Sequence, residues 1–236
     1  MQAAVLFEPG KPLEVEDLDL ASPQEDEVVV GMVASGVCHS CLHTADGSWT
    51  GFPMPMVLGD EGSVTVNADG TTTIATINGN VGDTDTIDVG DGFNVAIGGA
   101  ASDTVTVTGT AVDAQGIVLG DNGTLTLDVD GKLLSIASSD YEYGDTDTIQ
   151  LTSGTNAVIG GAGADSITAG SGTNTVLGDD GEATFAGGVL TSIQSTNSDS
   201  GANDVISLQD GTNTVVAGDG QDQVTIGAGT NMVLGD

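Results

Sequence analysis

The chain has 236 residues, of which 37 are glycine and only 3% are aromatic. Thirty-five acidic residues against two basic ones give a formal net charge of -33 at pH 7. This composition excludes an ordinary globular domain with a large aromatic core. The charge argues against nucleic acid and anionic lipid as partners, since both are polyanions, and it favours cations.

No stretch combines a charged n-region with an apolar h-region, and no apolar run reaches the roughly 18 residues of a membrane-spanning helix. The sequence therefore predicts neither a cleavable signal peptide nor a membrane span. Residues 1–62 hold both histidines, both cysteines and the only tryptophan, without an internal repeat. The runs AAVLF (3–7), LEVEDLDL (13–20) and EVVVGMVAS (27–35) predict strands.

GVCHSCLHTADGSW and GFPMPMVLGDEG, within residues 36–62, resemble the start of the catalytic domain of zinc-dependent alcohol dehydrogenases, the GroES-like part. The resemblance implies that Cys38 matches the first catalytic zinc ligand and Glu61 the glutamate beside the second. Asp60 stands where the family has its second ligand, a histidine, and Cys41 where it has an aspartate. The third ligand and the nucleotide-binding domain have no counterpart, and alcohol oxidation needs a hydride acceptor. We expect no catalytic residues and no enzyme activity.

Two interpretations of this segment stay open. Cys38, Cys41, His43 and Asp60 offer nitrogen, oxygen and sulfur ligands for Zn²⁺, so the segment could be a zinc-binding remnant of a dehydrogenase, an oxidoreductase that is inactive alone. The alternative, which we favour, is an unliganded thiol pair on a truncated barrel. Two cysteines that are so close and so few do not imply a disulfide framework.

The tetrapeptide VLGD occurs at 57–60, 118–121, 176–179 and 233–236 and divides the chain into three blocks, about 57–117, 118–175 and 176–236. We therefore expect a dehydrogenase-like segment at 1–62 and a repeat region at 63–236. Each block opens with a predicted β-hairpin, at 63–77, 124–138 and 182–196, because Asp-Gly or Gly-Gly turn dipeptides separate β-rich arms.

After the hairpins the chain follows a nine-residue period, which predicts a repeat architecture. Asp147, Asn156, Asp165 and Asn174 open successive nonapeptides, and the period returns at Asp204, Asn213, Asp222 and Asn231. An aliphatic residue stands two positions after each start, so every strand is expected to contribute one inward side chain. These residues are Ile149, Val158, Ile167, Val176, Ile206, Val215, Val224 and Val233.

GGAGADSIT (160–168) matches the calcium-binding β-helix nonapeptide G-G-x-G-x-D-x-U-x at every fixed position, and AGDGQDQVT (217–225) differs only at its first glycine. Two nonapeptides make one coil, so residues eighteen apart stack on one edge. Stacked corners on strands about 4.7–4.9 Å apart could together supply the six to eight oxygen ligands that Ca²⁺ prefers. We therefore expect calcium at the edge of the coil that carries the aspartates. The asparagines fall on the other edge, where a neutral amide is typical of a turn.

The stretch from about Gly82 to Asp236 resembles the RTX, or haemolysin-type, calcium-binding repeats of secreted and surface-exposed bacterial proteins. The resemblance implies a parallel β-roll, folding driven by calcium and an extracellular setting. Ala101 replaces a corner glycine, and GDTD at 82–85 and 144–147 replaces a double glycine, so weaker binding is expected at these corners.

The candidate calcium ligands fall in three sets. The carboxylates are Asp145, Asp147 and Asp165 in the middle block, Asp204, Asp219 and Asp222 in the last, and Asp83, Asp85 and Asp103 in a weaker first set; the candidate corner carbonyls surround Gly161, Gly163, Gly218 and Gly220.

The sequence thus predicts an all-β chain, a parallel β-roll or β-solenoid with β-hairpin insertions, preceded by a truncated GroES-like β segment. Its expected function is that of a calcium-binding module forming a spacer or adhesin segment outside a bacterial cell. In a rival interpretation the coil is folded without calcium, because its stacked inward aliphatic side chains stabilise it. A protein or surface partner is not identifiable from the sequence.

Overall fold

The computed structural model describes residues 2–17, 56–57, 62–77, 79–109, 114–197 and 201–235. These ranges contain strands and loops and no helix, so the described part of the chain is all-β. It therefore includes no helix long and apolar enough to cross a membrane. β1 (Gln2–Leu6), β2 (Glu14–Asp17) and β3 (Met56–Val57) form a small antiparallel sheet in the order β2-β1-β3. The strand expected at 27–35 lies outside the described residues.

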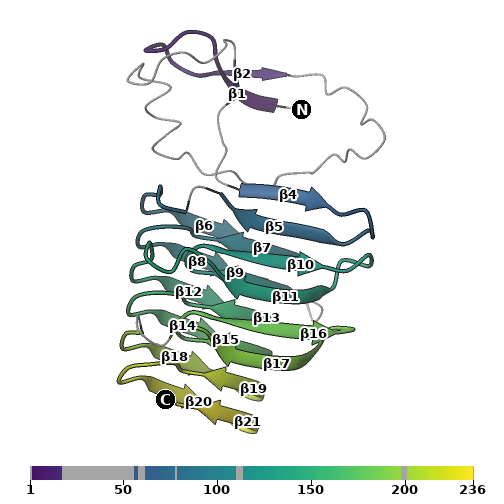
Figure 1. Cartoon of the computed structure of the whole chain (residues 1–236), viewed down its shortest axis with the longest axis vertical. Coiled ribbons are helices and arrows are strands. Elements are labelled where there is room, and N and C mark those ends of the chain that lie inside the picture. Colours follow the sequence, from purple (N-terminus) through teal and green to yellow (C-terminus); the bar gives the residue numbers. More distant parts are fainter. Residues whose placement is uncertain are drawn as a thin grey trace.

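Two six-stranded parallel sheets are built from the repeats, and the chain passes from one to the other at each successive strand (Figure 1). The first parallel sheet has the order β20-β18-β14-β12-β8-β6 and the second the order β21-β19-β15-β13-β9-β7. The first contains β6 (Thr86–Val89), β8 (Thr104–Val107), β12 (Thr148–Leu151), β14 (Ser166–Ala169), β18 (Val205–Leu208) and β20 (Gln223–Ile226). The second contains β7 (Phe93–Ile97), β9 (Gln115–Leu119), β13 (Gly154–Ile159), β15 (Gly172–Leu177), β19 (Gly211–Val216) and β21 (Gly229–Leu234).

The register of these sheets places equal repeat positions side by side. Ile149 pairs with Ile167 within a block, and Ile167 pairs with Ile206 across the hairpin that separates two blocks. The extra residues of each hairpin therefore leave the coil and return without shifting the register.

The three predicted hairpins form a third, antiparallel sheet in the order β17-β16-β11-β10-β5-β4. Its strands are β4 (Gly62–Val66), β5 (Thr72–Thr76), β10 (Gly123–Leu127), β11 (Leu133–Ser138), β16 (Gly181–Ala186) and β17 (Val189–Ser195). The turn glycines Gly70, Gly131 and Gly188 have φ of 85°, 78° and 83°, a left-handed conformation that favours glycine.

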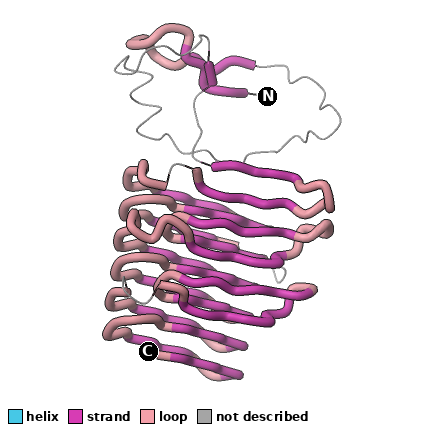
Figure 2. The backbone as a smooth tube through the Cα atoms, viewed as in Figure 1, coloured by secondary structure: helices cyan, strands magenta, loops and turns pink. Residues whose placement is uncertain are grey.

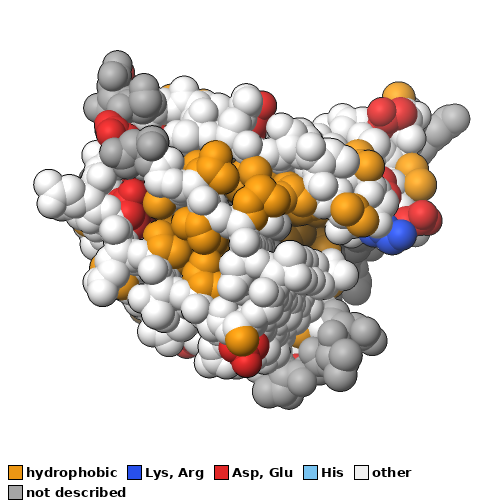
Figure 3. Space-filling model, turned by 90° about the horizontal axis from the view of Figure 1, so that it is seen from below, with side chains coloured by type: hydrophobic (Ala, Val, Ile, Leu, Met, Phe, Trp, Pro, Cys, Tyr) orange, Lys and Arg blue, Asp and Glu red, His pale blue; other side chains and the backbone are white. Residues whose placement is uncertain are grey.

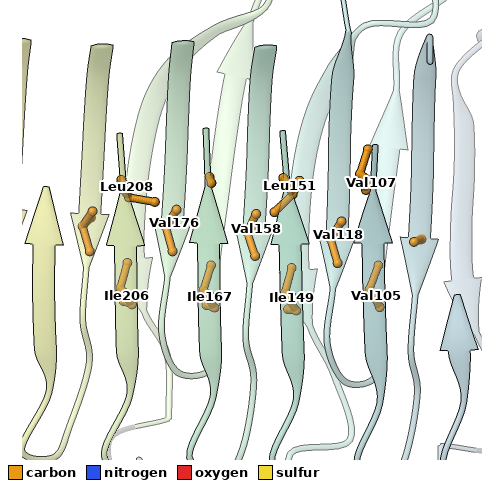
Figure 4. Close-up of a cluster of buried hydrophobic side chains, with 13 residues drawn as sticks. Val105, Val107, Val118, Ile149, Leu151, Val158, Ile167, Val176, Ile206 and Leu208 are labelled. Carbon is orange, nitrogen blue, oxygen red and sulfur yellow. The ribbon is translucent and has the colours of Figure 1, made fainter. Parts of the chain in front are cut away.

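Two apolar layers hold the three sheets together. The first lies between the parallel sheets, where Ile149, Ile167 and Ile206 are fully buried (Figure 4). The second lies between the second parallel sheet and the hairpin sheet, and includes Leu125 and Ile136. The hairpins therefore cover an aliphatic face that the coil would otherwise expose.

The aliphatic side chains that the sequence predicts to point inward are buried as expected, except in the last two strands, β20 and β21. Val224 is only partly buried, and Val233 is 48% exposed. β20 and β21 are edge strands of the described sheets, so none of the described strands covers these side chains on the outer side. Figure 3, seen from this end, shows apolar side chains on the surface.

The neighbouring residues Ile206 and Val205 test the first apolar layer. Ile206 is fully buried whereas Val205 is 46% exposed on the opposite face of β18. We expect Ile206→Ala to lower the free energy of unfolding by about 2–5 kcal/mol, because it leaves a cavity. Val205→Ala should change it by less than about 0.5 kcal/mol. Urea unfolding of both variants in one buffer measures this, and equal losses would contradict the layer.

Candidate metal centre

A column of aspartates runs along one edge of the first parallel sheet. One aspartate directly precedes each strand, and the register of the strands stacks the six residues in line. The loops that carry them form a stack beside the sheets (Figure 2). The aspartate column consists of Asp85, Asp103, Asp147, Asp165, Asp204 and Asp222.

One carboxylate oxygen of each residue from Asp103 onward ties the column together. The backbone N–H of each aspartate donates to the Oδ1 atom of the next, with N to O distances between 2.6 and 3.0 Å. The predicted pairs Asp85 with Asp103, Asp147 with Asp165, and Asp204 with Asp222 are therefore direct neighbours. The structure also joins these pairs into one continuous row.

The second carboxylate oxygen of three column aspartates lacks a hydrogen-bond partner. The Oδ2 atoms of Asp147, Asp165 and Asp204 are buried and have no hydrogen-bond partner. Each of these residues is at most 1% exposed. A buried charged oxygen without a partner costs considerable free energy. A cation that binds these oxygens would remove the penalty.

Backbone carbonyl oxygens face the same space. A Cβ built on Gly160 would lie 2.3 Å from Asp165 Oδ2 and 2.2 Å from the Gly178 carbonyl oxygen. The same pair of contacts recurs at Gly120, with Asp147 Oδ2 and the Gly160 carbonyl both at 2.3 Å. A carboxylate and a carbonyl oxygen therefore converge beside each glycine, and only glycine leaves the gap open. Oxygen ligands of this mixed kind suit Ca²⁺.

The remaining candidate carboxylates do not join the column. Asp145, Asp219 and Asp83 are exposed, and the Oδ1 atoms of Asp145 and Asp83 each accept a hydrogen bond from the next residue in their own loop. The Asp145 backbone carbonyl instead lies against Gly163, since a Cβ there would be 2.6 Å from its oxygen. Within the described residues, no three histidine, cysteine, aspartate or glutamate side chains converge as a metal cluster.

The candidate corner glycines all have positive φ: 111° at Gly161, 105° at Gly163, 103° at Gly218 and 142° at Gly220. Ala101, which replaces a corner glycine, is forced to φ 82°, a strained value for a residue with a Cβ. The zinc candidates Cys38, Cys41, His43 and Asp60 lie outside the described residues.

The asparagines form a second, self-satisfied column. Asn156, Asn174 and Asn213 each donate from Nδ2 to the Oδ1 atom of the next asparagine, at 2.8, 2.8 and 2.9 Å. Nδ2 of each also donates to the backbone carbonyl four residues earlier. An amide carries both donors and an acceptor, so identical residues can stack here without an ion.

Two further buried aspartates were not among the candidates. Asp121 and Asp179 close the repeated VLGD tetrapeptide and are 5% and 2% exposed. The signal in the sequence is the recurrence of VLGD, which on its own indicates only a block boundary. Both carboxylates accept backbone hydrogen bonds at the edge that carries the aspartate column.

Burial makes these carboxylates weak acids in the metal-free fold. Desolvation raises the pKa of Asp165 to about 10, and the nearby carboxylates of Asp147 and Asp204 add to the rise. The same cause raises the pKa of Asp147 and of Asp204 to about 7. Desolvation likewise raises the pKa of Asp121 to about 9, with Asp147 as its main charged neighbour. Stacked carboxylates therefore require either protons or a cation.

Comparison with known proteins finds two families in the chain, as both resemblances predict. The family of the alcohol dehydrogenase GroES-like domain matches residues 24–107, and the RTX calcium-binding nonapeptide repeat matches residues 144–184 and 199–233. Neither match covers half of the chain. No solved structure matches it significantly.

Two of the curated relatives are dehydrogenases that align with 62 to 71 residues of this chain. An alcohol dehydrogenase of Moraxella sp. (strain TAE123) is 45% identical over 71 residues, which are 30% of this chain and 21% of that protein. An S-(hydroxymethyl)glutathione dehydrogenase of Escherichia coli O9:H4 (strain HS) is 44% identical over 62 residues, 26% of this chain and 17% of that protein. The chain thus spans about a fifth of the length of these relatives.

The dehydrogenase-like match extends beyond residue 62, where the resemblance in the sequence ends. In the structure, however, β5 pairs with β10 and β8 pairs with β12. The described strands between residues 62 and 107 therefore belong to the sheets of the repeat region.

The raised pKa values predict that acid stabilises the metal-free fold. The pKa of an unfolded aspartate is about 3.9, whereas those of Asp147, Asp204 and Asp165 in the fold are about 7, 7 and 10. Between these values the fold holds protons that the unfolded chain has released, so stability is full below about pH 4 and falls as the pH rises through the folded values.

We therefore expect the chain, with metal removed by dialysis, to be more folded at pH 5 than at pH 8. Far-UV circular dichroism and urea unfolding at both values measure the difference. Greater stability of the metal-free chain at pH 8 would show that the column does not carry the buried carboxylates described above.

Proposed function

We propose that residues 63–236 are a calcium-binding repeat module that winds into a parallel β-roll when Ca²⁺ binds. The observation that carries this proposal is the row of buried Oδ2 atoms on Asp147, Asp165 and Asp204, which have no hydrogen-bond partner. The match to RTX calcium-binding repeats over the same corners supports calcium as the ion.

The proposed ligands follow from the geometry of the column. Asp103, Asp147, Asp165 and Asp204 contribute buried carboxylates, and Asp85 and Asp222, at the two ends, contribute less strongly held ones. Asp83, Asp145 and Asp219 contribute through the backbone of the corners, together with the carbonyls around Gly161, Gly163, Gly218 and Gly220. Because neighbouring corners share each ion, one corner alone binds weakly.

Calcium drives folding in this proposal because the fold brings like charges together. The metal-free chain has a net charge of -33 and must stack six carboxylates about one strand spacing apart. Binding free energy is then folding free energy, since the unfolded chain has no assembled site. Affinities near the 10⁻⁴–10⁻³ M that is typical of extracellular modules are expected.

The same reasoning supports a structural function. The column repeats one carboxylate at every level, whereas a glycosidase-like site needs one differentiated pair of carboxylates. We propose that the module is a stiff spacer or adhesin segment of a secreted or surface-exposed bacterial protein. Its three blocks, each a hairpin followed by four strands, correspond to about residues 57–117, 118–175 and 176–236.

Calcium titration of the whole chain tests the proposal. We expect a largely unfolded chain in chelator at pH 8 and a transition to sheet in millimolar Ca²⁺, followed by far-UV circular dichroism. Gly160→Ala should raise the calcium midpoint, because its Cβ would fill the space between Asp165 Oδ2 and the Gly178 carbonyl, an overpacking of about 1–3 kcal/mol.

Gly90→Ala is the matched control, because a Cβ at Gly90 meets nothing within 4 Å. Neither glycine has a positive φ, so the two variants differ in space rather than in backbone strain. A full sheet spectrum in chelator at pH 8, unchanged by calcium, would refute the proposal in favour of a coil held by its aliphatic layers alone.

The dehydrogenase similarity supports a second candidate for residues 1–62. This candidate is a zinc-binding remnant with Cys38, Cys41, His43 and Asp60 as ligands, and it rests on the likeness to enzymes named alcohol dehydrogenase and S-(hydroxymethyl)glutathione dehydrogenase. With unliganded thiols we expect less than one zinc per chain in elemental analysis of the purified protein. One zinc per chain, lost in Cys38→Ser, would support the remnant instead.

A further inference from the structure

Asp121 and Asp179 lie where a hairpin interrupts a corner of the coil. At the uninterrupted corner between β13 and β14 the chain reads Gly160-Gly161, whereas it reads Gly120-Asp121 after β9 and Gly178-Asp179 after β15. In both cases the chain leaves into a hairpin at this point. An aspartate therefore replaces the second corner glycine at each of these two insertions.

The two aspartates make the same pair of hydrogen bonds. Their Oδ1 atoms accept from the corner to which the chain returns after the hairpin, from Asp145 N at 3.3 Å and from Ala202 N at 3.1 Å. These donors stand at equivalent positions, two residues before Asp147 and Asp204.

The Oδ2 atoms reach the following corner instead. Asp121 Oδ2 accepts from Ala162 N at 2.6 Å, and Asp179 Oδ2 accepts from Asp219 N at 2.7 Å. These donors are again equivalent, three residues before Asp165 and Asp222. Each carboxylate thus bridges two successive corners of the calcium edge.

Glycine on the facing corner makes room for this bridge. A Cβ on Gly161 would lie 2.4 Å from Asp121 Oδ2, and one on Gly218 would lie 2.1 Å from Asp179 Oδ2. The same glycines have positive φ, 111° and 103°. Their backbone shape and their missing side chain therefore both serve the contact with the aspartate.

We propose that Asp121 and Asp179 are corner clamps, positioning residues that hold together the two corners between which a calcium ion is shared. This inference rests on the proposed calcium function. The hairpin separates the two halves of its corner by residues 122–143 or 180–201, and closing such a loop costs conformational entropy. The clamp rejoins the halves and aligns the column aspartates on both levels.

A carboxylate suits this task better than an amide. Both of its oxygens accept hydrogen bonds, and charge-assisted bonds are stronger than neutral ones. Asparagine would keep one acceptor and place a donor against the second backbone N–H. Alanine would remove both bonds.

Three variants of the whole chain test the clamps. Asp121→Ala and Asp179→Ala each remove one clamp. Asp128→Ala is the control, because Asp128 Oδ1 also accepts two backbone hydrogen bonds, from Asp130 N at 2.9 Å and Lys132 N at 2.8 Å, but in the turn of the β10–β11 hairpin. All three variants remove one carboxylate.

The clamp variants should raise the calcium concentration at the folding midpoint by about tenfold or more, as expected for two lost bonds to a charged acceptor. Asp128→Ala should stay within about twofold of wild type, because its two hydrogen bonds are exposed to solvent whereas those of Asp121 and Asp179 are buried or part-buried. In saturating calcium, amide exchange should quicken at Asp145 and Ala162 in Asp121→Ala, and at Ala202 and Asp219 in Asp179→Ala. A general loss of stability would instead quicken exchange at both pairs of amides in both variants.

If Asp121→Ala does not fold, Asp121→Asn keeps the test decisive. Its calcium midpoint should be higher than those of wild type and Asp128→Ala, but folding should still occur. Clamp variants that match Asp128→Ala in midpoint, or that leave these amides protected, would overturn the inference. A wild-type chain indifferent to calcium would refute the proposed function, and the amide pattern would then still decide whether the clamps exist.

Discussion

Parallel pairing in register is the constraint on which the rest of this structure depends. It places each repeat position directly beside its equivalent on the next strand, about one strand spacing away. Each side chain must therefore be compatible with a similar side chain at the same position of the neighbouring strand. Isoleucines gain from this arrangement, since Ile149, Ile167 and Ile206 form one continuous buried layer.

The two edges of the coil meet the same constraint with different chemistry. Asn174 donates to one neighbour and accepts from the other, so the asparagine column is complete by itself. A carboxylate has no donor, and Asp165 satisfies only one oxygen within the column. Ionised aspartates in a stack therefore need a cation, and this asymmetry makes one edge a candidate metal centre while the other is purely structural.

The hairpins extend this scheme without breaking it. They cover the outer aliphatic face of the second parallel sheet, as Ile136 and Leu125 show by their burial. They enter at corners of the aspartate edge, where a carboxylate takes the place of a glycine. A coil with thin apolar layers thereby gains a third sheet, and its register passes unchanged from Ile167 to Ile206.

The sequence by itself determined the period, the three hairpins and the edge on which Asp147 and Asp165 stack, because these depend on local spacing. It also singled out the corner glycines, such as Gly161, which have positive φ in the structure. Only the tertiary structure decided that the aspartates form one column and that the exposed side chain of Asp145 stays outside it. It alone revealed Asp121, whose hydrogen-bond partners lie 24 and 41 residues away. Contacts between residues so far apart depend on where the chain returns after each hairpin, and a repeat pattern does not encode that.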